Sequence, residues 1–268
     1  MTKTVDNPAP NLTRNPTRRD IENRELEPLH IARNSTKADV YKLEWPPNSG
    51  EFAVLKDMKK RPAWFRLGAG RWFLAREFRA LRKLSGIEGV PRALARPDAD
   101  CILMEWRAGT PIMEWKRDEV PAPALENIAQ VVAKSHARGV IHGDLHRSNV
   151  LLTPEGEVTL IDWATASVFG PRRSAVKNFT FEEWRVLDVR AVAKLKARHA
   201  PESMSETEKD ALLNGSNIYR LIRTAGFKIR KLMGHDRARS PEFAAERYKR
   251  LVERAEDQRG HKKPEDEA

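Results

Sequence analysis

The sequence predicts an α+β protein with a strand-rich first third and a helical remainder that is interrupted by one hairpin. Short runs of β-type residues fill residues 29–56 and are broken by a turn-rich stretch. Apolar residues recur at helical spacing in residues 71–84, in residues 124–138 and after Thr180. A chain of 268 residues is long enough to bury a substantial core.

The composition narrows the class of protein further. Lys and Arg outnumber Asp and Glu by 49 to 38, which favours an anionic partner. The single cysteine, Cys101, excludes an internal disulfide framework and a cysteine-rich zinc site. The sequence shows neither an apolar run of membrane-spanning length nor a signal peptide, so we expect a cytoplasmic protein, peripheral on the inner face of a membrane as one option.

Three strands are expected before residue 110. The turn residues 45–50 (WPPNSG) predict a hairpin that leads into a strand over residues 52–56. Residues 101–106 (CILMEW) read as a buried strand because nearly all of them are apolar. Together these segments predict an antiparallel sheet in the first third of the chain.

Two amphipathic helices complete this pattern. Residues 71–84 place apolar side chains at i, i+4 and i+7 opposite Arg and Lys, and this helix is expected to begin after Gly70 and to end before Gly86. Residues 124–138 form a second helix, and Ser135 and His136 lie on its apolar face.

The most informative segment contains three polar residues around a predicted hairpin. Its strands, residues 149–152 and 158–161, are joined by the turn Thr153-Pro154-Glu155-Gly156. An antiparallel pair brings its outer ends together, so Asn149 and Asp162 should project from neighbouring strand ends, with Asp144 on the adjoining loop. Two carboxylates and an amide oxygen suit a hard cation such as Mg²⁺.

A simpler interpretation is that these residues cap turns, which is the commonest role of any single Asp or Asn in such a position. The three together, with His142-Gly143 before them and apolar strands between them, favour the cation site.

This segment resembles the catalytic core of the protein-kinase-like superfamily. The residues HGDLHRSN, followed thirteen residues later by Asp162, match its H-x-D-x-x-x-x-N loop and its metal-binding aspartate. Gly143 and His146 replace the usual Arg and Lys, as in the atypical branch of aminoglycoside and choline-type phosphotransferases, RIO-like kinases and bacterial lipopolysaccharide-core sugar kinases. The resemblance implies a two-lobed fold with an antiparallel-sheet N-lobe containing one helix and a mostly helical C-lobe.

The resemblance also implies roles for these residues. Asp144 would orient the acceptor hydroxyl and take its proton, while Asn149 and Asp162 would hold Mg²⁺ against the phosphates of ATP. His142 and Asp188 would support the backbone of the catalytic loop. Asp188 has a simpler interpretation as a helix-terminal aspartate near the helix dipole.

Further superfamily positions lie in the first third of the chain. Lys56 resembles the lysine that contacts the α- and β-phosphates, and Glu77 resembles the helix glutamate that pairs with it. Alone, each would be read as a solvated surface residue. The stretch from Met104 to Arg107 resembles the hinge, where Met104 would be the gatekeeper and backbone groups of Glu105 and Arg107 would meet the adenine.

Two departures separate this chain from regulated protein kinases. With Val40 aligned to the valine of the family's Gly-rich loop, no glycine stands at the expected positions, and the hydroxyls of Ser35 and Thr36 with the charge of Lys37 are the candidates for phosphate contact. Asp162 and Asp188 are 26 residues apart, which is too short for a long phospho-regulated activation segment.

The expected organisation has five parts: a disordered lead-in over residues 1–20, an N-lobe over 21–103, a hinge over 104–110, a C-lobe over 111–239 and a charged C-terminal helix and tail over 240–268. Residues 217–259 contain twelve basic and six acidic side chains. A solvated helix face, a surface for anionic lipid headgroups or phosphorylated sugars, and an RNA contact are the three interpretations of this excess.

These observations lead to an ATP- and Mg²⁺-dependent kinase as the expected function. The preferred acceptor is a hydroxyl of a lipopolysaccharide-core sugar or another small or amphiphilic molecule. An atypical, RIO-like protein serine/threonine kinase is the alternative, and a non-catalytic nucleotide-binding module is a third reading. The expected partners are ATP and a hydroxyl-bearing acceptor, an anionic glycan or a protein, with no DNA.

Overall fold

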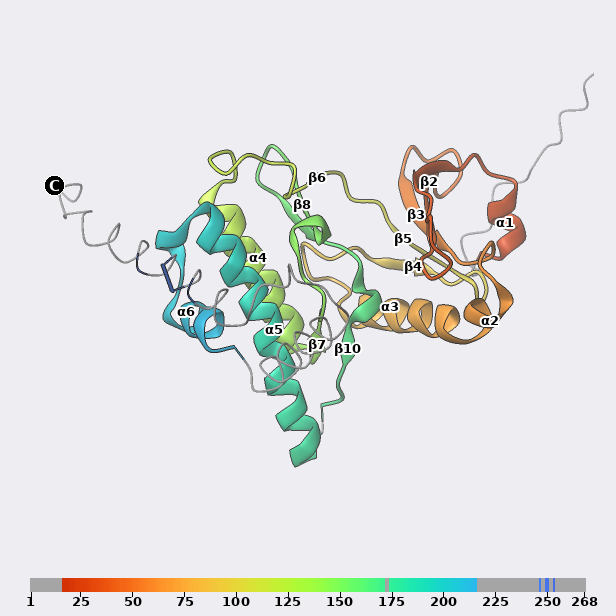
Figure 1. Ribbon diagram of the computed structural model, residues 1–268. Coiled ribbons are helices and arrows are strands. Elements are labelled where there is room, and N and C mark those ends of the chain that lie inside the picture. The colour runs from red at the N-terminus through yellow and green to blue at the C-terminus, as the bar shows by residue number, and fades with distance from the viewer. Residues whose placement is uncertain (1–15, 172–173, 216–245, 247–248, 251–252, 254–268) are drawn as a thin grey trace, which may run out of the picture. The chain divides into compact units, whose positions relative to one another are not determined.

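The computed structural model describes residues 16–171, 174–215, 246, 249–250 and 253 (Figure 1). The chain divides into two compact units. The first unit comprises the residues up to Gly86, Val90–Ala108 and Asp162–Thr165, and the second comprises Ile87–Gly89, Gly109–Ile161 and the chain from Ala166 onward. Most of the predicted lead-in, and nearly all of the basic stretch 217–259 and the predicted tail 240–268, lie outside the described residues.

The first unit is built on a five-stranded antiparallel sheet with the order β1-β2-β3-β5-β4. Its strands are β1 (Glu27–His30), β2 (Asp39–Glu44), β3 (Phe52–Asp57), β4 (Ala93–Ala95) and β5 (Cys101–Glu105). The predicted hairpin is confirmed, because β2 and β3 pair in continuous register from Asp39 opposite Asp57 to Glu44 opposite Phe52. The α+β class with an antiparallel sheet is therefore confirmed.

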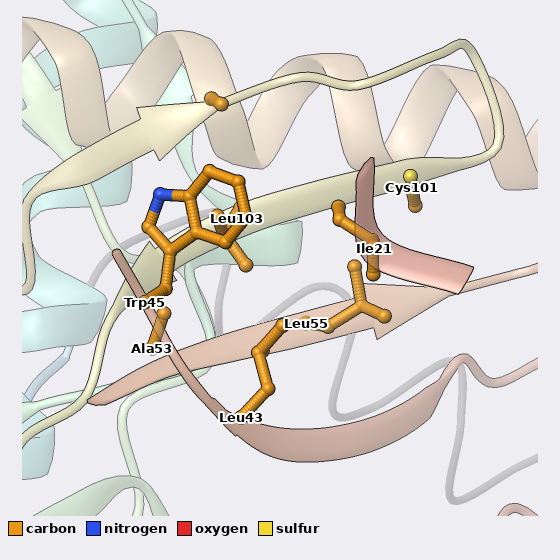
Figure 2. Packing of buried hydrophobic residues seen from close by; sticks show 8 residues of the cluster. Ile21, Leu43, Trp45, Ala53, Leu55, Cys101 and Leu103 are labelled. Atoms are coloured by element: carbon orange, nitrogen blue, oxygen red, sulfur yellow. The ribbon is translucent and has the colours of Figure 1, made fainter. Parts of the chain in front are cut away.

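One face of this sheet carries an apolar core (Figure 2). Leu43 belongs to β2 and Trp45 directly follows it, Ala53 and Leu55 belong to β3, and Leu103 belongs to β5, so every second residue of a strand faces the same side. Burying several large apolar side chains on one face is the main stabilising contribution that such a sheet offers.

The N-terminal boundary differs from the expectation. Residues up to about 20 were predicted to be disordered, but Arg18–Glu22 form α1, and Ile21 is buried in the core beside the sheet (Figure 2). The carboxylate of Asp20 accepts the backbone N–H of Thr17 at 2.7 Å. Arg18 forms ion pairs with Asp57 and Asp98. The composition of residues 1–20 alone could not predict contacts with residues so far along the chain.

The helix predicted over residues 71–84 is confirmed as α3, and two further helical pieces precede it. Three helical pieces follow one another along the chain, α2 (Ala63–Phe65), the π-helical stretch η1 (Arg66–Gly70) and α3 (Arg71–Lys83) (Figure 1). Gly68 and Gly70 therefore precede α3, as predicted, and belong to the π-helical stretch η1. Neither glycine has a positive φ, so helical backbone accommodates both.

The second unit contains the predicted hairpin and most of the helix. Strands β8 and β9 pair antiparallel, from Val150 opposite Leu160 to Leu152 opposite Val158, and the short strand β6 adds to β8. The remaining short strands, β7 and β10, pair with each other. The bounds of these elements are β6 (Thr110–Pro111), β7 (Val140–Ile141), the 3₁₀ turn η2 (Arg147–Asn149), β8 (Val150–Leu152), β9 (Val158–Leu160) and β10 (Ser167–Val168).

The helices of the second unit are α4 (Ala122–Ala137), α5 (Ala175–His199) and α6 (Glu206–Leu213), with the short 3₁₀ turn η4 (Pro201–Ser203) between the last two. Helices α5 and α6 share a core of Ala193, Ala197, Met204 and Leu212. Within the described ranges, none of the helices combines the length and the apolarity that crossing a membrane requires.

Candidate active site

A buried lysine lies between two carboxylates in the first unit. The Nζ atom of Lys56, on β3, is 2.7 Å from Oε1 of Glu77, on α3, and 2.9 Å from Oδ1 of Asp162. The side chains of Lys56, Glu77 and Asp162 are 14%, 2% and 48% exposed. The pairing that the resemblance implied for Lys56 and Glu77 is thus present, and Asp162 joins the same cation.

Local sequence explains why these groups meet. Alternation along β3 turns Ala53 and Leu55 into the apolar core and leaves Lys56 facing the other side of the sheet. On α3, Leu74, Glu77 and Leu81 follow at spacings of three and four, so they share one face of the helix. Glu77 therefore lies within the packed face of α3 and is buried, unlike a solvated surface residue.

The electrostatics of this cluster follow from burial and charge together. Burial alone would lower the pKa of Lys56, but the carboxylates of Glu77 and Asp162 outweigh it and raise that pKa above its usual value. Burial raises the pKa of Glu77, and the ammonium of Lys56 opposes this effect. The carboxylate of Glu77 also accepts the backbone N–H of Trp163, which ties the segment after Asp162 to α3.

The backbone of Asp162 adopts a left-handed conformation, with φ at 63°. A residue with a side chain pays a steric cost in this region, and such conformations concentrate at functional sites. Trp163, in the 3₁₀ turn η3 (Trp163–Thr165), is almost completely buried, and Arg76 of α3 donates to the carbonyl of Thr165. These contacts hold the segment in a conformation that Asp162 alone would not favour.

The candidate phosphate loop lies between β1 and β2. Ser35, Thr36 and Lys37 are exposed there, and β2 continues with Val40 directly opposite Lys56 in the sheet register. The loop therefore leads into the strand beside the lysine.

A buried ion pair between Asp39 and Arg61 restrains the backbone of this loop. The carboxylate of Asp39 pairs with Nη2 of Arg61 at 2.7 Å through both oxygens and accepts the backbone N–H of Ala32 at 3.0 Å. Nη1 of Arg61 donates to the carbonyls of Ala32 and Asn34, at 3.3 and 3.0 Å. Glycine is absent from this loop, and the pair of Asp39 and Arg61 supplies the restraint on its backbone.

The predicted hinge begins within β5, whose last two residues are Met104 and Glu105. Met104 is buried and paired in the sheet with Val54 and Ala93. The backbone N–H of Glu105 donates to the carbonyl of Arg92 at 2.9 Å, so this donor is already engaged within the sheet. Side-chain ion pairs link Glu105 to Arg92 and to Arg107, at 3.4 and 3.2 Å.

In the second unit, Asp188 holds the predicted catalytic loop. Its carboxylate accepts the backbone N–H of His142 at 2.7 Å and that of Gly143 at 2.9 Å, and it bonds Nε2 of His136 at 3.0 Å. Asp188 lies in the middle of α5 and is buried, so it is not the helix-terminal aspartate of the simpler interpretation.

His142 reinforces the same loop. Its Nε2 atom is 3.0 Å from the carbonyl of Ile161, and its Nδ1 atom accepts the backbone N–H of Asp144 at 3.4 Å, an arrangement that assigns the proton to Nε2. Gly143 has φ at 80°. A residue with a side chain would be strained there, which gives a local reason for glycine where related kinases carry arginine.

The polar groups at the outer end of the hairpin lie close together. Nδ2 of Asn149 donates to the carbonyl of Asp144 at 3.0 Å and is 3.3 Å from Nε2 of His146, which in turn is 3.6 Å from Oδ2 of Asp144. The backbone N–H of Ile161 donates to the carbonyl of Asn149, so the two ends of the hairpin meet as predicted. Asn149 lies in η2, one residue before β8.

The predicted site residues thus form two groups that belong to different units. Lys56, Glu77 and Asp162 come together in the first unit, and His142, Asp144, Asn149 and Asp188 come together in the second. Ser35, Thr36, Val40, Met104, Glu105 and Arg107 all belong to the first unit.

Sequence reasoning missed four supporting residues, which are Asp39, Arg61, His136 and His146. The position of His136 on the apolar face of its helix was visible as a pattern, because a polar ring there needs a buried partner. The pairing of Asp39 with Arg61 joins residues 22 positions apart from different elements and left no local signal.

The donor atoms of these groups fit the ligands expected of a kinase. Asn149 and Asp162 offer amide and carboxylate oxygens, the donor types that Mg²⁺ prefers, whereas a soft metal would require thiolate or imidazole. Among the described residues, no three His, Cys, Asp or Glu side chains gather into a separate metal site. The ammonium of Lys56 is a suitable partner for phosphate oxygens.

Comparison with known proteins places this arrangement in context. The family model described as "RIO1: RIO domain" matches residues 54–206. A stretch of 63 residues is 32% identical to a protein named serine/threonine-protein kinase rio2 from Dictyostelium discoideum. This similarity covers 24% of the present chain and 12% of that relative, so the chain matches only a small part of the relative's length.

Proposed function

Because this chain belongs to the RIO domain family, an atypical branch of the protein-kinase-like superfamily, we propose that it is an ATP- and Mg²⁺-dependent phosphotransferase. The proposed reaction moves the γ-phosphoryl group of ATP to a serine or threonine hydroxyl of a protein. The observation that carries the proposal is the contact of Lys56 with both Glu77 and Asp162, at 2.7 and 2.9 Å.

In this proposal the first unit binds the nucleotide. Lys56 contacts the α- and β-phosphates, and Glu77 fixes the ammonium in position, so little side-chain freedom is lost when ATP binds. The hydroxyls of Ser35 and Thr36 and the ammonium of Lys37 contact the remaining phosphate oxygens. In other kinases a Gly-rich loop covers the phosphates. The restraint of the present loop by Asp39 and Arg61 supports the same role for a loop without glycine.

The adenine would lie against the hinge. Val40 and Met104 supply apolar contacts, and backbone groups of Glu105 and Arg107 supply hydrogen bonds. Because the N–H of Glu105 already donates within the sheet, the proposed contact at this residue uses its carbonyl oxygen.

Asn149 and Asp162 are the proposed ligands of Mg²⁺. When bound, the ion neutralises charge on the phosphates and favours the in-line geometry of transfer. The bond from Nδ2 of Asn149 to the carbonyl of Asp144 fixes the side-chain amide. Its Oδ1 atom points away from this carbonyl and is the atom that would bind the ion.

Asp144 is the proposed catalytic base. Its carboxylate is exposed and would accept the proton of the acceptor hydroxyl as the bond to phosphorus forms. Asp188 and His142 hold the backbone around Asp144, which keeps the carboxylate in a defined position without burying it.

The phosphate acceptor could be a sugar or a protein, and the comparisons bear on this choice. A lipopolysaccharide-core sugar was our first expectation from the sequence, but neither comparison supports it. The Dictyostelium relative is named a serine/threonine-protein kinase, which favours the alternative, a protein acceptor. The short segment between Asp162 and Asp188 supports a kinase that does not depend on phosphorylation of an activation loop.

One experiment tests both levels. The protein is incubated with γ-labelled ATP and Mg²⁺ together with a generic protein acceptor, a deacylated lipopolysaccharide or a pool of sugars. Label is expected on protein serine or threonine in the wild type and not in the Asp144→Asn variant. Transfer to glycan alone would refute the protein acceptor, and equal transfer by wild type and variant would refute the role of Asp144.

A further inference from the structure

An exposed apolar stripe runs along the helical segment that precedes and begins α3 in the first unit. Trp64, Leu67 and Trp72 are 73%, 55% and 55% exposed. Phe65 and Leu74 of the same segment are buried. One side of the segment is therefore packed against the first unit, while the stripe of Trp64, Leu67 and Trp72 faces outward.

The π-helical stretch explains why these three residues share a side. An α-helix returns to the same side after three or four residues, which relates Trp64 to Leu67. A π-helical turn closes its hydrogen bonds over five residues, which relates Leu67 to Trp72 across Arg66–Gly70. The stripe extends over roughly 12 Å at the helical rise per residue, and the exposed residues Gly68 and Ala69 add no polar side chain to it.

The surroundings of the stripe are strongly basic. Residues 58–84 contain nine Lys and Arg side chains and a single acidic one, Glu77. Carboxylates from elsewhere in the first unit pair with some of these cations, Glu22 with Lys59 and Asp100 with Arg66 and Arg71. Arg61 is paired with Asp39. The nine basic side chains still outnumber Glu77 and these three carboxylates in formal charge.

We propose that the stripe of Trp64, Leu67 and Trp72 docks on an anionic lipid bilayer. Indole rings and leucine enter the headgroup region of a bilayer, and basic residues beside them are attracted to anionic lipids. The helical backbone satisfies its own hydrogen bonds, so this segment can enter an apolar layer at low cost. The inference concerns binding and does not depend on the proposed phosphotransfer.

Two other occupants fit the charges and contacts less well. A second copy of this chain would bring two basic surfaces together, and like charges disfavour association. A nucleic acid would call for outward-directed guanidinium groups, whereas those of Arg66 and Arg71 donate to Asp100 within the first unit. The anionic bilayer is the occupant that uses both the apolar stripe and the surrounding positive charge.

Co-sedimentation with lipid vesicles tests the proposal on the full chain. Binding is expected to vesicles of phosphatidylcholine and phosphatidylglycerol in equal parts, to weaken as salt is raised, and to be slight with phosphatidylcholine alone. The double variant Trp64→Ser/Trp72→Ser should bind at least about tenfold more weakly, because burial of each indole is lost. Phe179→Ser, which removes an apolar side chain 58% exposed on α5 of the second unit, should leave binding unchanged.

Gly68 offers a test in both directions. A Cβ atom at this position meets no atom within 4 Å, so a side chain can be added without disturbing the fold. Gly68→Leu should strengthen vesicle binding and Gly68→Glu should weaken it, while circular dichroism and the thermal midpoint show that both variants fold like the wild type.

Several results would overturn the proposal. These are equal binding to neutral and anionic vesicles, absence of vesicle binding by the folded wild type, and unchanged binding by the double tryptophan variant. A dimer in sedimentation velocity, or binding to polyuridylate, that is lost in this variant while vesicle binding is absent would assign the stripe to another partner instead.

Discussion

The two groups of candidate site residues are held in opposite ways. In the first unit, Lys56 and Glu77 are buried and linked directly by charge at 2.7 Å. In the second unit, the side chain of Asp144 is 56% exposed, and its Oδ2 atom lies 3.6 Å from Nε2 of His146. Position there is set by the backbone, which Asp188 holds through two N–H groups.

This difference matches two different chemical tasks. A phosphate-binding cation benefits from preorganisation in a buried setting, where charge interactions are strong. A base that must meet an incoming hydroxyl has to remain accessible, so its side chain is left open while its backbone is fixed. We therefore expect substitutions in the first group, and of the proposed Mg²⁺ ligand Asn149, to alter nucleotide binding. Substitutions of the other residues of the second group should alter transfer or loop stability.

The largest effect is expected for Asp144→Ala. Loss of the proposed base should lower kcat by about 10³-fold, within the range for general base catalysis, and leave ATP affinity nearly unchanged. Steady-state kinetics with a protein acceptor and nucleotide titration measure the two quantities. Near-normal turnover would show that the exposed carboxylate has no role in transfer and would remove the contrast between the two groups.

Asp188→Asn should destabilise the second unit, although the two side chains have nearly the same shape. The amide offers one acceptor oxygen and turns its NH₂ group toward the remaining donor, so one backbone N–H of the loop loses its partner, at a cost of about 2 kcal/mol in the free energy of unfolding. Chemical denaturation measures this loss. Glu182→Gln, which alters an exposed pair with Arg185 on the same helix, is the control and should change the free energy by less than about 0.5 kcal/mol.

Arg61→Ala should raise the KM for ATP by about threefold to tenfold, an estimate of about 1 kcal/mol for lost preorganisation of the loop, with kcat little changed. Arg61→Lys should raise the KM less, because it keeps the charge beside Asp39 but loses the bonds of Nη1 to the carbonyls of Ala32 and Asn34. The control is Arg18→Lys, which weakens another ion-paired arginine of the first unit that does not contact this loop. Equal KM values in the Arg61 and Arg18 variants would contradict the positioning role.

The smallest expected effect concerns protonation of Lys56. Its raised pKa means that the ammonium persists above the ordinary lysine value of 10.5, so its contribution to folding is present below that pH and is lost as pH rises through the folded pKa. Glu77→Gln removes one of the two carboxylates while burial remains, and should lower the pKa of Lys56. Nuclear magnetic resonance of the labelled lysine measures the shift, and an unchanged pKa would mean that Glu77 does not hold the charge.

The sequence predicted features that depend on local periodicity or on a compact motif. The hairpin of β2 and β3, the helix α3 and the pairing of β8 with β9 all follow from side-chain alternation and turn residues close together in the chain. The group around Asp144 was predictable for the same reason, since HGDLHRSN lies in one short segment.

Features that depend on distant partners were not predictable in this way. The helix α1 is stabilised by contacts of Arg18 with Asp57 and Asp98, far along the chain. The helical pieces before α3 begin at Ala63 and contain two glycines. Glycine has a low helix propensity, so local sequence did not predict these pieces. Asp39 and Arg61 meet only because β2 and the segment after β3 are brought together by the sheet.

The central claim is that the first group, with Asn149 as a second Mg²⁺ ligand, binds Mg²⁺-ATP and that Asp144 acts on the acceptor. Calorimetric titration of ATP, with and without Mg²⁺, into the wild type, Asp162→Ala and Asp144→Ala tests it most directly. The account predicts that Mg²⁺-dependent binding is lost in Asp162→Ala and retained in Asp144→Ala. Retention of metal-dependent binding in Asp162→Ala, or its loss in Asp144→Ala, would contradict this division of roles.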